Sequence, residues 1–87
     1  MHGRYATVFI LPNGQALGRL GIAATKKLGG SVQRNRAKRL IREVFRHNKL
    51  AHGFDVVVVP KRELLEATPK AFEAEYRQNI QRRVRQR

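Results

Sequence analysis

Between residues 31 and 49 the sequence concentrates groups that bind phosphate. The segment SVQRNRAKRLIREVFRHNK contains seven Lys and Arg residues but a single acid, Glu43. Guanidinium groups bind phosphate oxygens through paired N–H donors, and ammonium groups bind them as point charges. Because like charges at this density repel one another along a helix, we expect an external polyanion to neutralise them.

Groups that could make the chain a nuclease in its own right are scarce. Protein nucleases use clustered carboxylates that hold metal ions, or a general acid–base pair such as two histidines. The single aspartate, Asp55, opens a predicted strand, and Glu43 lies one helical turn before His47, which favours a local ion pair. His47 and His52 have no further ligands to complete a metal site. We therefore expect no catalytic residue in this chain, and no metal or cofactor bound by it.

The composition supports a small nucleic-acid-binding domain. The 87 residues predict one domain, residues 1–87, and the 19 Lys and Arg against 6 Asp and Glu give a net charge of +13. Residues 1–42 contain no acid, and residues 26–49 hold nine of the basic residues. There is no cysteine and no apolar run of the roughly 20 residues that a membrane span needs. We expect a soluble, cytoplasmic protein without a membrane partner.

The first third of the chain predicts two strands. Residues 5–11, YATVFIL, are rich in β-branched and aromatic residues, and residues 17–25 resume that pattern after the turn signal PNG. The two strands are expected to form an antiparallel hairpin. Gly18 and Gly21 indicate a close backbone approach or a bulge in the second strand, and a glycine-rich loop follows over residues 26–31, where Ser31 is expected to cap a helix.

The remaining pattern predicts helix, strand, helix. From about residue 33 the apolar residues recur at helical spacing, namely Ala37, Leu40, Ile41, Val44 and Phe45. Residues 54–60, FDVVVVP, predict a strand that is central in its sheet or covered on both faces. Thr68 and Pro69 predict the start of a last helix, with Phe72, Tyr76, Ile80 and Val84 along one side. Residues 82–87 are expected to form a basic tail that is too charged to be ordered.

The order of elements predicts an α+β fold, a small two-layer sandwich with a central mixed sheet. The two strands on either side of the basic helix should be parallel, because a helix connects them. On that helix, a 100° rotation per residue gathers Lys38, Arg39, Arg42, Arg46 and Lys49 opposite the apolar stripe, with Asn35 among them, while Arg34 and Arg36 flank the stripe. A solvated helix face normally mixes both charge signs, so this face predicts nucleic-acid binding. The absence of a helix-turn-helix signal favours RNA over DNA.

Residues 24–46, ATKKLGGSVQRNRAKRLIREVFR, resemble the signature region of the bacterial ribonuclease P protein subunit. The matched positions are Lys26, Lys27, Gly29, Arg34, Asn35, Arg36, Lys38, Arg39, Arg42, Glu43, Phe45 and Arg46. The resemblance implies a protein cofactor of a ribozyme that removes the 5′ leader from precursor tRNA. The RNA subunit of that endonuclease holds the catalytic Mg²⁺.

The resemblance also implies partners and roles. The partners would be ribonuclease P RNA and precursor tRNA, with a monomeric protein in the holoenzyme. The RNA backbone would lie on Arg34, Asn35, Arg36, Lys38, Arg39 and Arg42, with Lys26, Lys27 and Arg46 in support. It further implies a left-handed crossover at the strand–helix–strand unit, although general statistics favour the right-handed sense in about 98% of cases.

A second surface implied by the resemblance is a cleft over one sheet face for the single-stranded leader. Tyr5, Thr7 and Phe9 share one strand parity, and an exposed aromatic can stack on a base. For Phe9 core packing is the alternative. Members of the family normally begin with a helix before the first strand, and residues 1–87 start almost at that strand. Two interpretations follow: the sequence is truncated before that strand, or the cleft is incomplete.

Two other functions are compatible with the same residues. A structural RNA-binding protein of ribosomal type would bind ribosomal RNA and leave precursor-tRNA cleavage unchanged. A stand-alone nuclease would cleave RNA without any RNA subunit, and the scarcity of catalytic groups argues against it.

Overall fold

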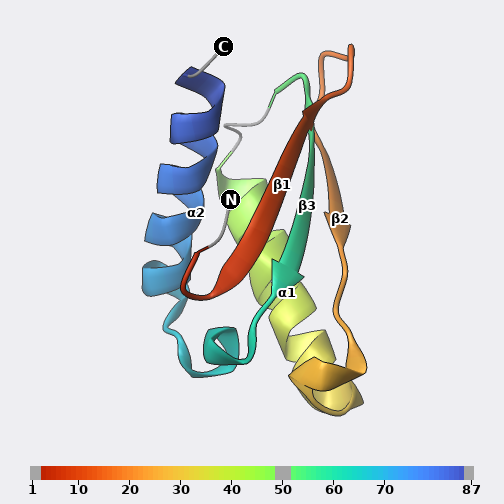
Figure 1. Ribbon diagram of the computed structural model, residues 1–87, viewed down its shortest axis with the longest axis vertical. Helices are drawn as coiled ribbons and strands as arrows, with labels where there is room; N and C mark the ends of the chain where they lie inside the picture. The colour runs from red at the N-terminus through yellow and green to blue at the C-terminus, as the bar shows by residue number, and fades with distance from the viewer. Residues whose placement is uncertain (1–2, 49–51, 86–87) are drawn as a thin grey trace.

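The computed structural model describes residues 3–48 and 52–85. Its strands and α-helices are, in chain order, β1 (Ala6–Pro12), β2 (Arg19–Ile22), α1 (Ser31–His47), β3 (Phe54–Pro60) and α2 (Pro69–Arg85). Two short 3-10 helices, η1 (Lys26–Leu28) and η2 (Arg62–Glu66), connect them. Both α-helices lie on one face of the sheet (Figure 1), which confirms the predicted two-layer α+β sandwich. No helix in the described part of the chain combines the length and the apolar character that a membrane crossing requires.

The three strands form a mixed sheet in the order β1-β3-β2. β3 is central, antiparallel to β1 and parallel to β2, so the prediction of two parallel strands around α1 is confirmed. The predicted hairpin is wrong, because β1 and β2 both pair with β3 and not with each other. The uninterrupted valine run of β3 can pair on both edges, and this long-range pairing prevails over the local turn signal.

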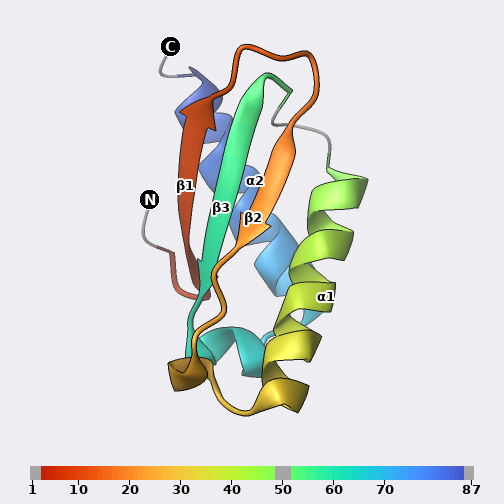
Figure 2. The same cartoon turned by 90° about the vertical axis from the view of Figure 1, so that its right-hand side faces the viewer.

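The connection from β2 through α1 to β3 has the unusual hand. In Figure 2 the open face of the sheet is toward the viewer, β2 and β3 both run downward, and α1 lies behind the sheet beside β2. The chain therefore passes from β2 to β3 by a left-handed crossover, as the resemblance implied.

β2 is shorter than the sequence pattern suggested. It covers four residues, and its pairing with β3 runs without interruption from Arg19 opposite Asp55 to Ile22 opposite Val58, so no bulge occurs in the paired part. Glycine weakens a strand because it adds backbone entropy to the unfolded chain and offers no side chain for packing. Gly21 pairs with Val57 of β3, and a side chain at position 21 would contact Val57.

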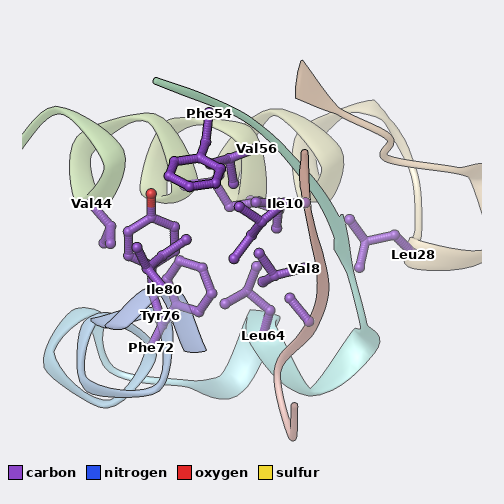
Figure 3. Packing of buried hydrophobic residues seen from close by; sticks show 14 residues of the cluster. Val8, Ile10, Leu28, Val44, Phe54, Val56, Leu64, Phe72, Tyr76 and Ile80 are labelled. Atoms are coloured by element: carbon purple, nitrogen blue, oxygen red, sulfur yellow. The ribbon is translucent and has the colours of Figure 1, made fainter. Parts of the chain in front are cut away.

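The hydrophobic core lies between the sheet and the two helices (Figure 3). Val8, Val56, Val58, Ile41, Phe72 and Tyr76 are among its most buried members. Ala37, Ile41 and Val44 are buried and Leu40 and Phe45 half-buried, which confirms the apolar stripe of α1. The Tyr76 hydroxyl points from α2 toward α1 and has no hydrogen-bond partner. Its burial raises the pKa of Tyr76 to about 12.

The helix boundaries correct two predictions. Residue Gly30 is the N-cap of α1 and makes no side-chain cap, so Ser31 is the first helical residue and does not cap the helix. α2 begins as predicted, with Thr68 Oγ1 accepting a hydrogen bond from the Ala71 N–H at 3.1 Å. It continues to Arg85, well into the segment expected to be a disordered tail, because Arg and Gln are good helix formers. The side chain of Val84 lies outside the described part of the chain.

One polar residue ties the basic helix to its neighbour. The Asn48 amide, at the C-cap of α1, donates to the Val44 carbonyl oxygen at 2.9 Å and to Glu73 Oε2 at 2.7 Å. Its side-chain oxygen accepts a hydrogen bond from Arg77 Nη1 at 3.2 Å. Asn48 is 5% exposed, so these bonds form in a largely dehydrated place and fix the end of α1 against α2.

Candidate nucleic-acid interface

The cations of α1 form one surface because the helix turns its apolar stripe into the core. The buried side of α1 packs against β2 and α2, and most side chains on the other side are exposed. We define the α1 basic face as the six cationic residues of this helix, Arg34, Arg36, Lys38, Arg39, Arg42 and Arg46. Asn35 is exposed among them. Lys49, which the sequence assigned to the same face, lies outside the described residues.

No acid of the described residues forms an ion pair with this face. Among the side chains that the structure describes, the single ion pair within 4.0 Å joins Arg19 to Asp55, and neither residue lies on α1. The local ion pair expected between Glu43 and His47 is therefore not formed. Arg36, Arg39, Arg42 and Arg46 are exposed, while Arg34 and Lys38 are half-buried. Such a surface can bind phosphates without first breaking internal pairs.

The Arg34 side chain contains a buried hydrogen-bond donor without an acceptor. Its Nε atom is buried and has no hydrogen-bond partner. A buried donor without an acceptor costs free energy unless a ligand or a solvent molecule supplies one.

Lys26 and Lys27 lie apart from the α1 basic face. Both are exposed on η1, which contacts the start of α1 through the buried Leu28. The turn that separates them from α1 requires glycine, because Gly29 has φ of 142° and a side chain there would come within 3.1 Å of Gln33. These two lysines extend the positive surface beyond the N-terminal end of the helix.

The second surface is the face of the sheet that no helix covers (Figure 2). Along β1 the core residues Ala6, Val8 and Ile10 alternate with Thr7, Phe9 and Leu11. Along β3 the buried residues alternate with half-buried Asp55, Val57 and Val59. Phe9 is 50% exposed opposite Val57, so the alternative of core packing is wrong for this residue. An exposed ring on an open sheet is suited to stacking on a base.

The other two residues assigned to this surface are less open. Thr7 is only 9% exposed. Tyr5 precedes β1, is half-buried against the core and carries the Arg4 guanidinium 5.6 Å from its ring centroid. Glu75 fixes this segment by accepting hydrogen bonds from the backbone N–H groups of Arg4 and Tyr5 at 2.7 and 3.1 Å. Of the three residues, Phe9 therefore offers the free aromatic surface.

The sequence did not indicate a polar clamp at the other end of the sheet. Arg19 Nε and Nη2 donate to the two oxygens of Asp55 at 2.8 and 2.7 Å, and Asn13 Nδ2 donates to Asp55 Oδ1 at 3.0 Å. The hydrogen bonds from Arg19, and then from Asn13, lower the pKa of Asp55. Asp55 thus stays ionised and holds the loop between β1 and β2. Within the described residues, no three His, Asp or Glu side chains gather as a metal site would require.

The fold and these surfaces define a class of small α+β proteins in which a polycationic helix stands beside an open sheet. Comparisons with known proteins narrow the class. A family model described as Ribonuclease P matches residues 1–85. The chain therefore belongs to the ribonuclease P protein family.

Individual relatives agree with this assignment. The chain is 41% identical over 68 residues to the ribonuclease P protein component of Thermotoga maritima, covering 76% of this chain and 58% of that protein. It is 41% identical over 73 residues to the protein of the same name from Dehalococcoides mccartyi, covering 84% of this chain and 59% of the relative. The chain thus spans less than two thirds of the length of these relatives.

In the solved structures the match covers a larger share of the other chain than it does in these relatives. The RNase P protein from Thermotoga maritima superposes with a TM-score of 0.85 at 33% identity, covering 94% of this chain and 80% of that one. The Staphylococcus aureus RNase P protein gives a TM-score of 0.76 at 30% identity, covering 90% and 73%. The chain therefore shares its fold with these RNase P proteins.

Proposed function

We propose that this chain is the protein component of a bacterial ribonuclease P, which assists an RNA subunit in removing the 5′ leader from precursor tRNA. The observation that carries the proposal is the α1 basic face, six cations that have no acidic partner among the described residues. The names of the relatives and of the matched structures support the same proposal. We further propose that the chain acts as a monomer in the holoenzyme and in the cytoplasm.

In this function the protein acts through electrostatics and not through covalent chemistry. A preformed helix face places its guanidinium groups where RNA phosphates can replace bound counterions, and the release of these ions drives association. The planar fork of arginine can hold two phosphate oxygens at once. Neutralising phosphates of the RNA subunit and of precursor tRNA reduces the repulsion between the two polyanions. The Mg²⁺ that supports cleavage belongs to the RNA subunit in this proposal.

The open sheet face supplies a second contact, for the single-stranded leader. Phe9 can stack on one base there, and Val57, Val59 and Leu11 extend the apolar floor around it. Because stacking tolerates any base, this surface suits leaders of varied sequence. The α1 basic face and the sheet face would then serve two different RNA segments.

The test is leader removal from a precursor tRNA at low Mg²⁺ concentration, with a bacterial ribonuclease P RNA alone, this protein alone, and both together. We expect cleavage only in the mixture. Cleavage by the protein alone would show a stand-alone nuclease. Binding to ribosomal RNA, with no gain in cleavage from the mixture, would instead show a structural RNA-binding protein of ribosomal type.

A further inference from the structure

A pocket of about 370 Å³ lies between the C-terminal half of α1 and the segment that enters β2. Leu20 and Phe45 line it and are half-buried against the core, so they form its inner wall. Leu17 also lines it and is 70% exposed, which places this residue at the mouth. The pocket is separate from the open sheet face that carries Phe9.

The outer wall of this pocket is held rigidly. The Leu17 carbonyl oxygen accepts a hydrogen bond from Asn13 Nδ2 at 3.0 Å, and the same amide bonds to Asp55. Asn13 Oδ1 accepts from the Gln15 N–H at 2.8 Å, and Arg19 holds Asp55 through two bonds. The backbone at Leu17 is therefore held in place before any ligand arrives, which lowers the entropic cost of binding.

The charges around the pocket indicate what it binds. Arg42 and Arg46 line it from the α1 basic face, and the described residues that line it include no acid. An apolar interior with cations at its edge complements a ligand that joins a flat, weakly polar group to an anion. A nucleotide has this chemistry, with its base as the flat group and its phosphate as the anion.

We propose that this pocket takes one unpaired nucleobase of the bound RNA, with the adjoining phosphates on Arg42 and Arg46. The inference rests on the proposed function, because it names a specific contact within the RNA complex. Leu20 and Phe45 contact the faces of the base, and Leu17 closes over its exposed edge. The Asn48 side chain, also in the lining, is engaged with Val44, Glu73 and Arg77. The remaining polar side chain of the lining apart from the two arginines is that of exposed His52. The pocket therefore has few groups to read base identity and should accept purines and pyrimidines alike.

The direct test uses AMP, UMP and ribose 5-phosphate as probes, followed by methyl resonances of Leu17 and Leu20 in NMR titrations. We expect both nucleotides to shift these resonances through ring currents and ribose 5-phosphate, which lacks a base, to leave them nearly unchanged. Equal shifts from all three compounds would show phosphate binding only and overturn the proposal. The proposal would also be overturned if AMP and UMP left the resonances of Leu17 and Leu20 unchanged, or if they shifted only the signals of Phe9 and Leu11.

The second test uses the intact RNA, without precursor tRNA. Leu17→Ala should weaken binding to ribonuclease P RNA by roughly tenfold, since it removes apolar contact with the base, and should leave the salt dependence unchanged because no charge is lost. Val32→Ala is the matched control, an apolar residue that is 69% exposed at the N-terminal end of α1 and outside the pocket lining, and it should bind as the unaltered protein does. Because both residues are exposed, melting temperatures should change little.

The outcomes separate this inference from the proposed function. If the unaltered protein fails to bind the RNA, the proposed function is wrong. If it binds and Leu17→Ala binds equally well, the nucleobase pocket is wrong and the proposed function stands.

Discussion

The salt dependence of RNA binding offers the sharpest check on the α1 basic face. If each of its six cations meets one phosphate, the logarithm of the binding constant should fall against the logarithm of salt concentration with a slope of about −4 to −5. The double variant Arg39→Ala/Arg42→Ala removes two of these contacts. Its slope should therefore be shallower by about 1.4 to 1.8.

The loss of affinity follows from the same relation. At 0.1 M salt the two missing contacts correspond to a loss of roughly 25- to 60-fold, and the difference should vanish as the salt concentration approaches about 1 M. The fold should persist, because both side chains are exposed. Removing Arg42 also relieves its like-charge repulsion with Lys38 and Arg46, which lie at i, i+4 spacing. This relief should stabilise α1 by about 0.2–0.5 kcal/mol per pair.

Filter binding to ribonuclease P RNA at several potassium concentrations measures both quantities. The matched control is Arg82→Ala/Arg83→Ala, which removes the same charge from exposed positions on α2. We expect this control to keep the slope of the unaltered protein. Equal losses in the two double variants would mean that net charge drives binding, and the assignment of a specific face would be refuted.

Three further changes test other parts of the structure. Phe9→Ala should weaken binding of single-stranded leader RNA by about five- to 150-fold, since a stacking platform is lost, with little change in melting temperature because the ring is half exposed; unchanged leader affinity would remove Phe9 from the site. Asn48→Ala should lower the free energy of unfolding by about 1–3 kcal/mol, as it strands buried partners on α1 and α2, and a denaturant titration with an unchanged midpoint would contradict this. Tyr76→Phe should raise stability by about 1 kcal/mol near neutral pH because it removes an unpaired buried hydroxyl. Since folding raises the pKa of Tyr76 from 10.0 to about 12, the unfolded state loses its proton first, and stability should fall between those pH values by up to about 1.4 kcal/mol per pH unit; melting curves of Tyr76→Phe should lack this component.

The sequence predicted the parts of the fold that local patterns determine. The apolar period of α1 and its charge were visible because residues three and four apart share a helix face. The bounds of β3 matched because Gly53 and Pro60 enclose an uninterrupted β-branched run. The Thr68 cap was found from a pattern of adjacent residues.

The wrong hairpin and the missed Asp55 clamp share one physical cause, which is pairing between distant residues. The hairpin failed because β3, more than 40 positions after β1, inserts between the two early strands. The Asp55 clamp joins residues 36 and 42 positions apart, and the nucleobase pocket exists only where β2 and α1 meet. Alternate residues of a strand lie on opposite faces. The polar Asp55 could therefore have indicated that Val57 and Val59 share its face, which is the open face of the sheet.

The α1 basic face is sustained by contacts that do not involve its charges. Burial of Ile41 and Val44 against the sheet and the bonds of Asn48 to α2 hold the helix, while the unpaired cations repel one another and oppose it. Phosphates on this face turn that repulsion into attraction, so the folded state should bind RNA far better than an unfolded chain with the same charges dispersed. By mass action, RNA that prefers the folded state stabilises it by RT ln(1 + [RNA]/Kd). The clustering of charge that weakens the free protein is therefore the same property that couples its folding to its RNA partner.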